Sequence, residues 1–180
     1  MSKTSQLLIA GFGGQGVQFC GKFLAMVGLN EGREVSYLSS YGPEVRGGTS
    51  NCSVIISDEA VGSPIVTDPE ILVALNLPSL DKFESRAVPG AKIFVDSSLI
   101  DRKVERVDTE NFYMPATQMA SDNGLTGFAN MIMLGYLVRN SEVVSYDEVL
   151  RTVEKMVAGK KPGLLEKNLK ALDLGYNYNN

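Results

Sequence analysis

The sequence predicts an α/β fold, a three-layer α/β/α arrangement around a mostly parallel or mixed sheet, formed as a single domain over residues 1–180. Short apolar runs alternate with segments whose apolar residues recur at helical spacing. A glycine-rich turn joins the first apolar run to the first helical segment. With 44% hydrophobic residues, a chain of this length can bury one sizeable core. Some connections are short, which favours a mixed sheet.

The strands are expected where apolar runs are bounded by turn residues, at 6–11, 34–39, 50–57, 71–75 and 91–96, with shorter extended pieces at 104–107 and 111–114. On 50–57, alternation with an additional Ile55 indicates that both faces are partly covered. Pro89-Gly90 marks a turn before the strand at 91–96.

The helices are expected where apolar residues recur at helical spacing, at 16–31, in a short stretch opened by Pro78, and at 126–139, 146–158 and 164–174. In the first, Phe19, Phe23, Met26 and Val27 carry this spacing. The segment 126–139 is too apolar for a helix with one solvated face, and Asn130 near its start suggests a cap or a buried hydrogen bond.

The ends of the last two helices are also predicted from local sequence. Ser145 and Glu148 have the spacing of a capping box that opens 146–158. Gly159 and Pro162 would end that helix, and Gly175 would end the last one.

The turn Gly11-Phe12-Gly13-Gly14-Gln15-Gly16 has the G-x-G-x-x-G pattern and gives the chain a Rossmann-like start. Gly13, Gly14, Gln15 and Gly16 could offer backbone N–H groups to a phosphate at the start of a helix. A dinucleotide site also needs an acidic residue at the end of the second strand, where this chain has Ser39-Ser40-Tyr41. The pattern therefore indicates either an anion site other than a standard NAD site, or tight helix–strand packing alone.

A second glycine-rich loop follows at residues 41–50, at the same end of a strand expected to be adjacent to the first. Its candidate binding residues are Tyr41, Glu44, Arg46, Gly47, Gly48 and Thr49. Ordering such a loop is costly, which favours a functional role over an ordinary surface loop. Arg46 can present a planar fork to a phosphate or a carboxylate, although a surface ion pair with Glu44 is the alternative.

Composition excludes several functions for the chain by itself. There is no histidine, and Cys20 and Cys52 cannot supply the four thiolates of an ordinary iron–sulfur cluster, so they are interpreted as small buried residues. The net charge of −4 argues against nucleic acid as the main partner. We expect no signal peptide and no membrane span, and hence a soluble cytoplasmic domain. Any catalysis would then depend on another chain.

Taken together, these motifs resemble the gamma subunit, or gamma domain, of the 2-oxoacid:ferredoxin (acceptor) oxidoreductases. The resemblance runs nearly end to end and is carried by the two glycine-rich motifs at 11–16 and 41–48, followed by 63–64, 80–83, 115–117, 129–135 and 168–171. The first two motifs are specific only in combination. Residues 100–112 match nothing in particular.

The resemblance implies a non-catalytic subunit of a complex that converts a 2-oxoacid to an acyl-CoA, with 2-oxoglutarate as the first candidate and pyruvate or branched-chain or aryl 2-oxoacids left open. The complex would use thiamine diphosphate, Mg, iron–sulfur clusters and coenzyme A, none of them held by this chain alone. The expected partners are alpha and beta subunits and a ferredoxin-like delta subunit. The glycine-rich loops would face these partners and help to shape the coenzyme A region.

Two other functions remain open. The chain could be a free-standing nucleotide- or CoA-binding protein that uses the same loops. Alternatively, the loops could be purely structural and the chain an assembly scaffold. A homodimer of the isolated chain is also left open.

Overall fold

The computed structural model describes residues 3–40, 49–157, 160 and 163–179. Their strands form a sheet in the order β2-β3-β1-β4-β5-β6. The strands are β1 (Thr4–Phe12), β2 (Glu34–Ser40), β3 (Thr49–Ser57), β4 (Ile71–Ala74), β5 (Lys92–Asp96) and β6 (Glu110–Met114). The α-helices are α1 (Val17–Asn30), α2 (Leu77–Phe83), α3 (Ala116–Asp122), α4 (Ala129–Ser141), α5 (Tyr146–Val157) and α6 (Leu164–Tyr176), and a 3-10 turn (Glu84–Arg86) follows α2.

The sheet is mixed, as the short connections suggested. β1, β4, β5 and β6 are parallel, whereas β3 is antiparallel to both β1 and β2. In the sheet, β3 lies between β1 and β2 and pairs with both of them. The expectation that β1 and β2 are adjacent is wrong for this reason.

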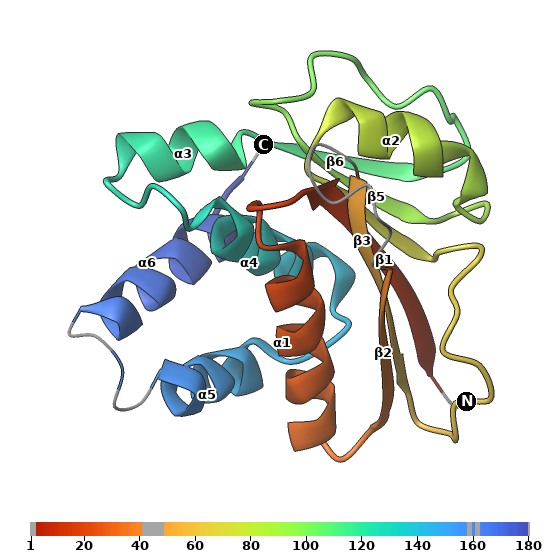
Figure 1. The fold of residues 1–180 in the computed structure, drawn as a ribbon, viewed down its shortest axis with the longest axis horizontal. Coiled ribbons are helices and arrows are strands. Elements are labelled where there is room, and N and C mark those ends of the chain that lie inside the picture. The colour runs from red at the N-terminus through yellow and green to blue at the C-terminus, as the bar shows by residue number, and fades with distance from the viewer. Residues whose placement is uncertain (1–2, 41–48, 158–159, 161–162, 180) are drawn as a thin grey trace.

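The helices are divided unequally between the faces of the sheet (Figure 1). α1, α4, α5 and α6 pack on one face, where a large apolar core includes Leu7, Ile9 and Val54. α2 covers part of the other face, where a smaller core includes Leu8, Ala10 and Leu80. The alternation of Leu7, Leu8 and Ile9 follows the two-residue period of a strand, so β1 contributes side chains to both cores.

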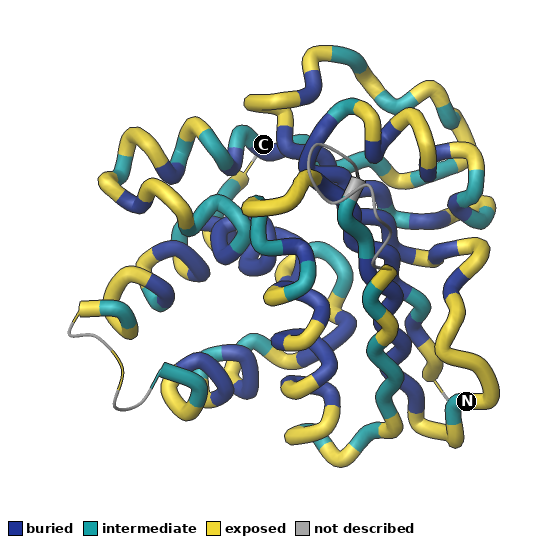
Figure 2. Tube along the Cα trace, viewed as in Figure 1, coloured by how far each residue is buried: buried dark blue, intermediate teal, exposed yellow. Residues whose placement is uncertain are grey.

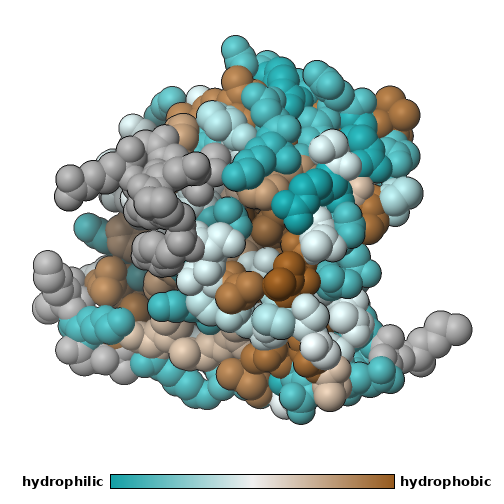
Figure 3. All heavy atoms as spheres, turned by 45° about the vertical axis from the view of Figure 1, so that its right-hand side comes forward, coloured by the Kyte–Doolittle hydropathy of each residue, from teal (hydrophilic) through white to brown (hydrophobic). Residues whose placement is uncertain are grey.

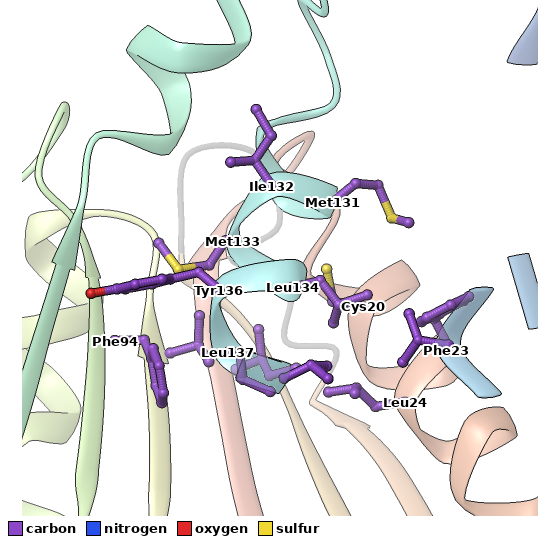
Figure 4. Packing of buried hydrophobic residues seen from close by; sticks show 14 of the residues in the cluster. Cys20, Phe23, Leu24, Phe94, Met131, Ile132, Met133, Leu134, Tyr136 and Leu137 are labelled. Atoms are coloured by element: carbon purple, nitrogen blue, oxygen red, sulfur yellow. The ribbon is translucent and has the colours of Figure 1, made fainter. Parts of the chain in front are cut away.

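Helix α4 lies at the centre of the larger core. Every residue from 131 to 138 is buried, which explains why its sequence lacks a solvated face (Figure 2). Figure 4 shows α4 beside α1 with its labelled side chains pointing in several directions, and the Tyr136 ring meets Phe94 of β5 edge-on, with centroids 5.9 Å apart. The core therefore surrounds α4 instead of lying beneath it.

Helix α6 crosses α4 at very short range, and two glycines allow this. A Cβ built on Gly175 would lie 1.8 Å from the carbonyl oxygen of Ile132, and one on Gly135 would lie 2.2 Å from that of Leu172. The prediction that Gly175 closes the last helix is wrong. α6 continues to Tyr176, and Gly175 serves the contact between the two helices.

Several other elements differ from the sequence prediction. α4 begins at Ala129 instead of residue 126, with Phe128 at the N-cap and no side-chain cap, so a capping role for Asn130 is not seen. Helix α3 was not predicted. Residues 104–107 form no strand, because the N–H groups of Glu105 and Arg106 bond to the Glu84 carboxylate.

The start of α5 keeps half of the expected capping box. The Ser145 hydroxyl accepts a hydrogen bond from the Glu148 N–H at 3.3 Å, as predicted. The reciprocal bond is absent, because the Ser145 N–H donates to Glu31 Oε1 at 2.6 Å and the Glu148 carboxylate pairs with Arg151.

Candidate functional site

A cleft opens at the carboxyl ends of the parallel strands β1, β4 and β5. It has a volume of about 210 Å³. It is lined by Gly14, Gln15, Leu75, Asp96, Leu99, Thr117, Gly127, Ala129 and Asn130. From β1 the chain continues into α1 on one face of the sheet, and from β4 it continues into α2 on the other. Open α/β sheets bind ligands at this kind of topological switch point.

Two of the helices that border the cleft start there without a side-chain cap. Gly16 precedes α1 and Phe128 precedes α4, and neither helix has an acidic residue in its first turn. The first N–H groups of a helix have no intrahelical acceptor, and the helix dipole makes that end electropositive. The cleft is therefore suited to an anionic group.

The start of α3 also borders the cleft, but its polar groups are already satisfied. Asp96, at the end of β5, is 1% exposed. Its carboxylate accepts hydrogen bonds from the Ser98 N–H at 3.0 Å and from the Thr117 hydroxyl at 2.6 Å, and it also accepts from the Thr117 N–H. The Asp96 carboxylate is therefore held in place by hydrogen bonds and forms one side of the cleft.

Gln15 holds the glycine turn in place. Its side-chain oxygen accepts from the Phe12 N–H at 2.6 Å, and its amide nitrogen donates to the Leu75 carbonyl at 2.8 Å. Asn76 Nδ2 also donates to Gln15 Oε1 at 3.2 Å, while Asn76 Oδ1 accepts from the Ser79 N–H at the start of α2. The Gln15 side chain thus joins the ends of β1 and β4 and does not extend into the cleft as a free group.

Glycine is required in this turn for two reasons. Gly14 and Gly16 have φ of +95° and +79°, where other residues are strained. A Cβ on Gly16 would also lie 2.2 Å from Nδ2 of Asn130, so the start of α4 lies directly against the turn.

The structure brings together only part of the predicted site. Gly14 and Gln15 line the cleft, whereas Gly13 and Gly16 belong to the same turn without lining it. Tyr41, Glu44, Arg46, Gly47 and Gly48 lie outside the described residues. Thr49 begins β3 and is in register with Phe12, so the second loop ends beside the glycine turn.

Other lining residues were missed by the sequence analysis, notably Asp96 and Thr117. Asp96 ends a predicted strand, and the rule that parallel strands end at the same edge of a sheet could have identified it. Thr117 lies in the unpredicted helix α3, and no local signal pointed to it.

Both cysteines lie in the core, as interpreted. Burial raises the pKa of the Cys20 and Cys52 thiols to about 12, so both are neutral at pH 7. Among the residues that the structure describes, no group of three or more Cys, Asp or Glu side chains could hold a metal ion. Within the same residues, no helix is long and apolar enough to cross a membrane.

Comparison with known proteins identifies the family. The pyruvate ferredoxin/flavodoxin oxidoreductase model matches residues 6–178. The chain belongs to this family. It is 41% identical over 167 residues to the ketoisovalerate oxidoreductase subunit VorA of Methanothermobacter thermautotrophicus, with 93% of this chain and 35% of that relative covered. The chain thus spans about a third of the length of that relative.

Other relatives match the present chain over nearly their whole length. The 2-oxoglutarate synthase subunit KorC of Methanocaldococcus jannaschii is 37% identical over 175 residues, which cover 95% of this chain and 91% of KorC. The crystal structure of the gamma subunit of a keto/oxoacid ferredoxin oxidoreductase from Geobacter sulfurreducens superimposes with a TM-score of 0.81 at 27% identity, with 96% of each chain covered. The fold predicted from the sequence is confirmed.

Proposed function

We propose that this chain is the gamma-type subunit of a multi-subunit 2-oxoacid:ferredoxin oxidoreductase of the cytoplasm, and that its cleft contributes anion-binding groups to the coenzyme A site. Membership of the family supports the first part. The observation that carries the second is the convergence of two uncapped helix starts, those of α1 and α4, at the switch-point cleft.

The cleft fits part of a coenzyme A molecule. Phosphate groups are the anions that helix starts and glycine turns bind, and coenzyme A carries both a pyrophosphate and a 3′-phosphate. A volume of about 210 Å³ accommodates only a part of so large a ligand. Under this proposal the remaining contacts come from the loop at 41–48 and from other subunits.

The redox chemistry would lie in other chains. In the proposed complex, thiamine diphosphate and iron–sulfur clusters held by other chains would supply the chemistry of decarboxylation and electron transfer, and coenzyme A would be the acyl acceptor. The residues of this chain would bind and orient the coenzyme through backbone N–H groups. Gln15 would keep those groups in position, because it ties the turn to the end of β4.

The choice of substrate among related 2-oxoacids is also part of the proposal. The relatives are named for ketoisovalerate and for 2-oxoglutarate. We keep 2-oxoglutarate as the first candidate, since the chain and KorC match over most of their lengths. Reduction of a viologen dye by the purified complex, compared across 2-oxoglutarate, ketoisovalerate and pyruvate, tests this choice.

A charge placed in the glycine turn tests the coenzyme A site. Nothing lies within 4 Å of a Cβ built on Gly14, so a side chain fits there, although its φ of +95° imposes the same backbone strain on Asp and on Asn. In the assembled enzyme, Gly14→Asp should raise the KM for coenzyme A at least tenfold over Gly14→Asn. The KM for the 2-oxoacid should not change.

Equal coenzyme A kinetics in the two Gly14 variants would contradict an anion site in this turn and leave the loops with a scaffold role. Saturable binding of NAD or FAD by the isolated chain, with no assembly, would favour the free-standing nucleotide-binding protein.

A further inference from the structure

The solvent-facing side of α1 is unusually apolar. Phe19, Met26 and Leu29 are 38%, 42% and 58% exposed, and Lys22 is the charged residue among them. Their spacing of three, four and three residues places these four side chains, the α1 stripe, along one side of the helix. Figure 2 shows exposed segments recurring along α1. Phe19 and Met26 were expected to share a face with Phe23 and Val27, but only the latter two are buried.

The exposed side of α5 has a different composition. The exposed residues of α5 are Asp147, Arg151, Glu154 and Lys155, all of them charged. A solvated helix face is normally built in this way. The α1 stripe therefore departs from the charged exposed side of α5, and contiguous exposed apolar surface marks interaction sites.

Two side chains of the stripe, those of Phe19 and Lys22, contact neighbouring aromatic rings. The Phe19 ring stacks on the buried Phe23 ring with centroids 6.0 Å apart and an interplanar angle of 18°. The Lys22 ammonium lies 5.9 Å from the centroid of the Tyr37 ring. Among the described residues no carboxylate forms a salt bridge with Lys22. A complementary surface would be apolar and would carry an acidic group opposite Lys22.

The lengths of the relatives indicate which protein such a surface would contact. The domain occurs within a VorA chain about three times as long, and as most of the KorC chain. In the long chain the domain is covalently joined to further protein. Where the domain is a separate chain, the corresponding contact has to form between subunits. Because α1 begins directly after the glycine turn, a subunit docked on it would lie beside the cleft.

We propose that the α1 stripe is the docking surface for the separate subunit that corresponds to the remaining two-thirds of the VorA-type chain. That subunit meets Phe19, Met26 and Leu29 with an apolar surface and Lys22 with a carboxylate. This inference rests on the proposed function, because it requires the chain to work within a complex.

Co-expression of this chain with that subunit, followed by size measurement and a dissociation constant for the purified pair, tests the proposal. The double variant Met26→Glu/Leu29→Glu should weaken association at least tenfold, and Lys22→Glu should weaken it less. Val107→Glu is the matched control, since Val107 is 98% exposed and lies far from α1 in the sequence; it should bind like the wild type. Thermal melts of each variant alone establish that it is folded.

Hydrogen exchange gives a second measurement that needs no variant. The backbone amides of α1 should exchange more slowly when the wild-type pair forms, while the exchange of those of α5 should be unchanged. Normal assembly of the double variant, together with unprotected α1 in the wild-type pair, would overturn the docking surface but leave the proposed function intact. No assembly of the wild-type chain would overturn both. Loss of a homodimer in the double variant, with no effect on the hetero-complex, would make the stripe a self-interface and overturn the proposal.

Discussion

The two faces of the sheet are stabilised in different ways. On the face of α1, α4, α5 and α6, apolar side chains surround a buried helix, and α4 and α6 touch backbone to backbone. On the face of α2, a smaller core is closed at its rim by polar groups. Figure 3 shows hydrophilic residues gathered on the upper right of the face in view, at the level of α2. The first face depends on shape and tolerates little added volume, whereas the second depends on paired charges.

Glu84 is the centre of the polar rim. One oxygen of its buried carboxylate accepts from the N–H groups of Glu105 and Arg106, and the other pairs with Arg102 Nη2 at 2.8 Å. Arg106 in turn donates to the carbonyl of Ala87 at 2.8 Å and pairs with Asp108 at 2.7 Å. A loop without regular structure is thereby fixed to the end of α2.

The largest effect is expected from added volume between α4 and α6. Gly175→Ala places a methyl group 1.8 Å from the Ile132 carbonyl oxygen, which only a separation of the helices can relieve. We expect a loss of about 3 kcal/mol or more in the free energy of unfolding, measured by urea denaturation. Gly62→Ala is the control, because nothing lies within 4 Å of its Cβ position. Equal stability of the two variants would contradict the close helix contact.

A somewhat smaller loss is expected when the polar rim is broken. Glu84→Ala leaves two backbone N–H groups without an acceptor and removes one partner of Arg102. The loss should be about 2 kcal/mol, and Glu84→Gln, which keeps an acceptor oxygen, should lose less. Urea denaturation gives the free energies, and hydrogen exchange should show faster exchange at residues 105 and 106. Unchanged exchange there would show that the loop is held by other contacts.

The smallest effect concerns pH and the buried thiols of the α4 face. The pKa of Cys20 and Cys52 is raised from 9.0 to about 12, chiefly by burial. Above pH 9 the unfolded chain releases these protons while the folded chain retains them until about pH 12, so stability falls over this range. Near pH 9.8 the loss should be about 1 kcal/mol for each thiol relative to pH 7.5.

Comparison of the wild type with Cys20→Ala/Cys52→Ala under reducing conditions isolates the contribution of the thiols to this pH dependence. The double variant is expected to be less stable at pH 7.5 but to lose less stability on going to pH 9.8. Parallel pH profiles would show that other groups cause the alkaline loss.

The sequence by itself determined the class of fold and most of the elements, and it favoured a mixed sheet without excluding a mostly parallel one. Local patterns were sufficient there, because two-residue and helical periodicities reflect burial that each segment carries in its own side chains. The glycine turn at 11–16 was also predictable, since a G-x-G-x-x-G pattern after an apolar run specifies its backbone. The lack of a solvated face on α4 was predictable for the same reason, since apolar residues recur all around its central turns.

Only the tertiary structure decided which features serve contacts between distant segments. Gly175 has the sequence character of a helix end, and its role in the crossing with α4 depends on Ile132, forty-three residues earlier. Glu84 prevents a strand at 104–107 by taking its N–H groups, and Asp96 reaches Thr117 in a helix that has no local signal. The exposure of one side of α1 was likewise not predictable from the sequence, because Phe19 and Met26 have the same spacing as core residues. Which side of a helix faces water is set by the elements packed against it. Those elements are distant in the sequence, so the local pattern of the helix does not reveal them.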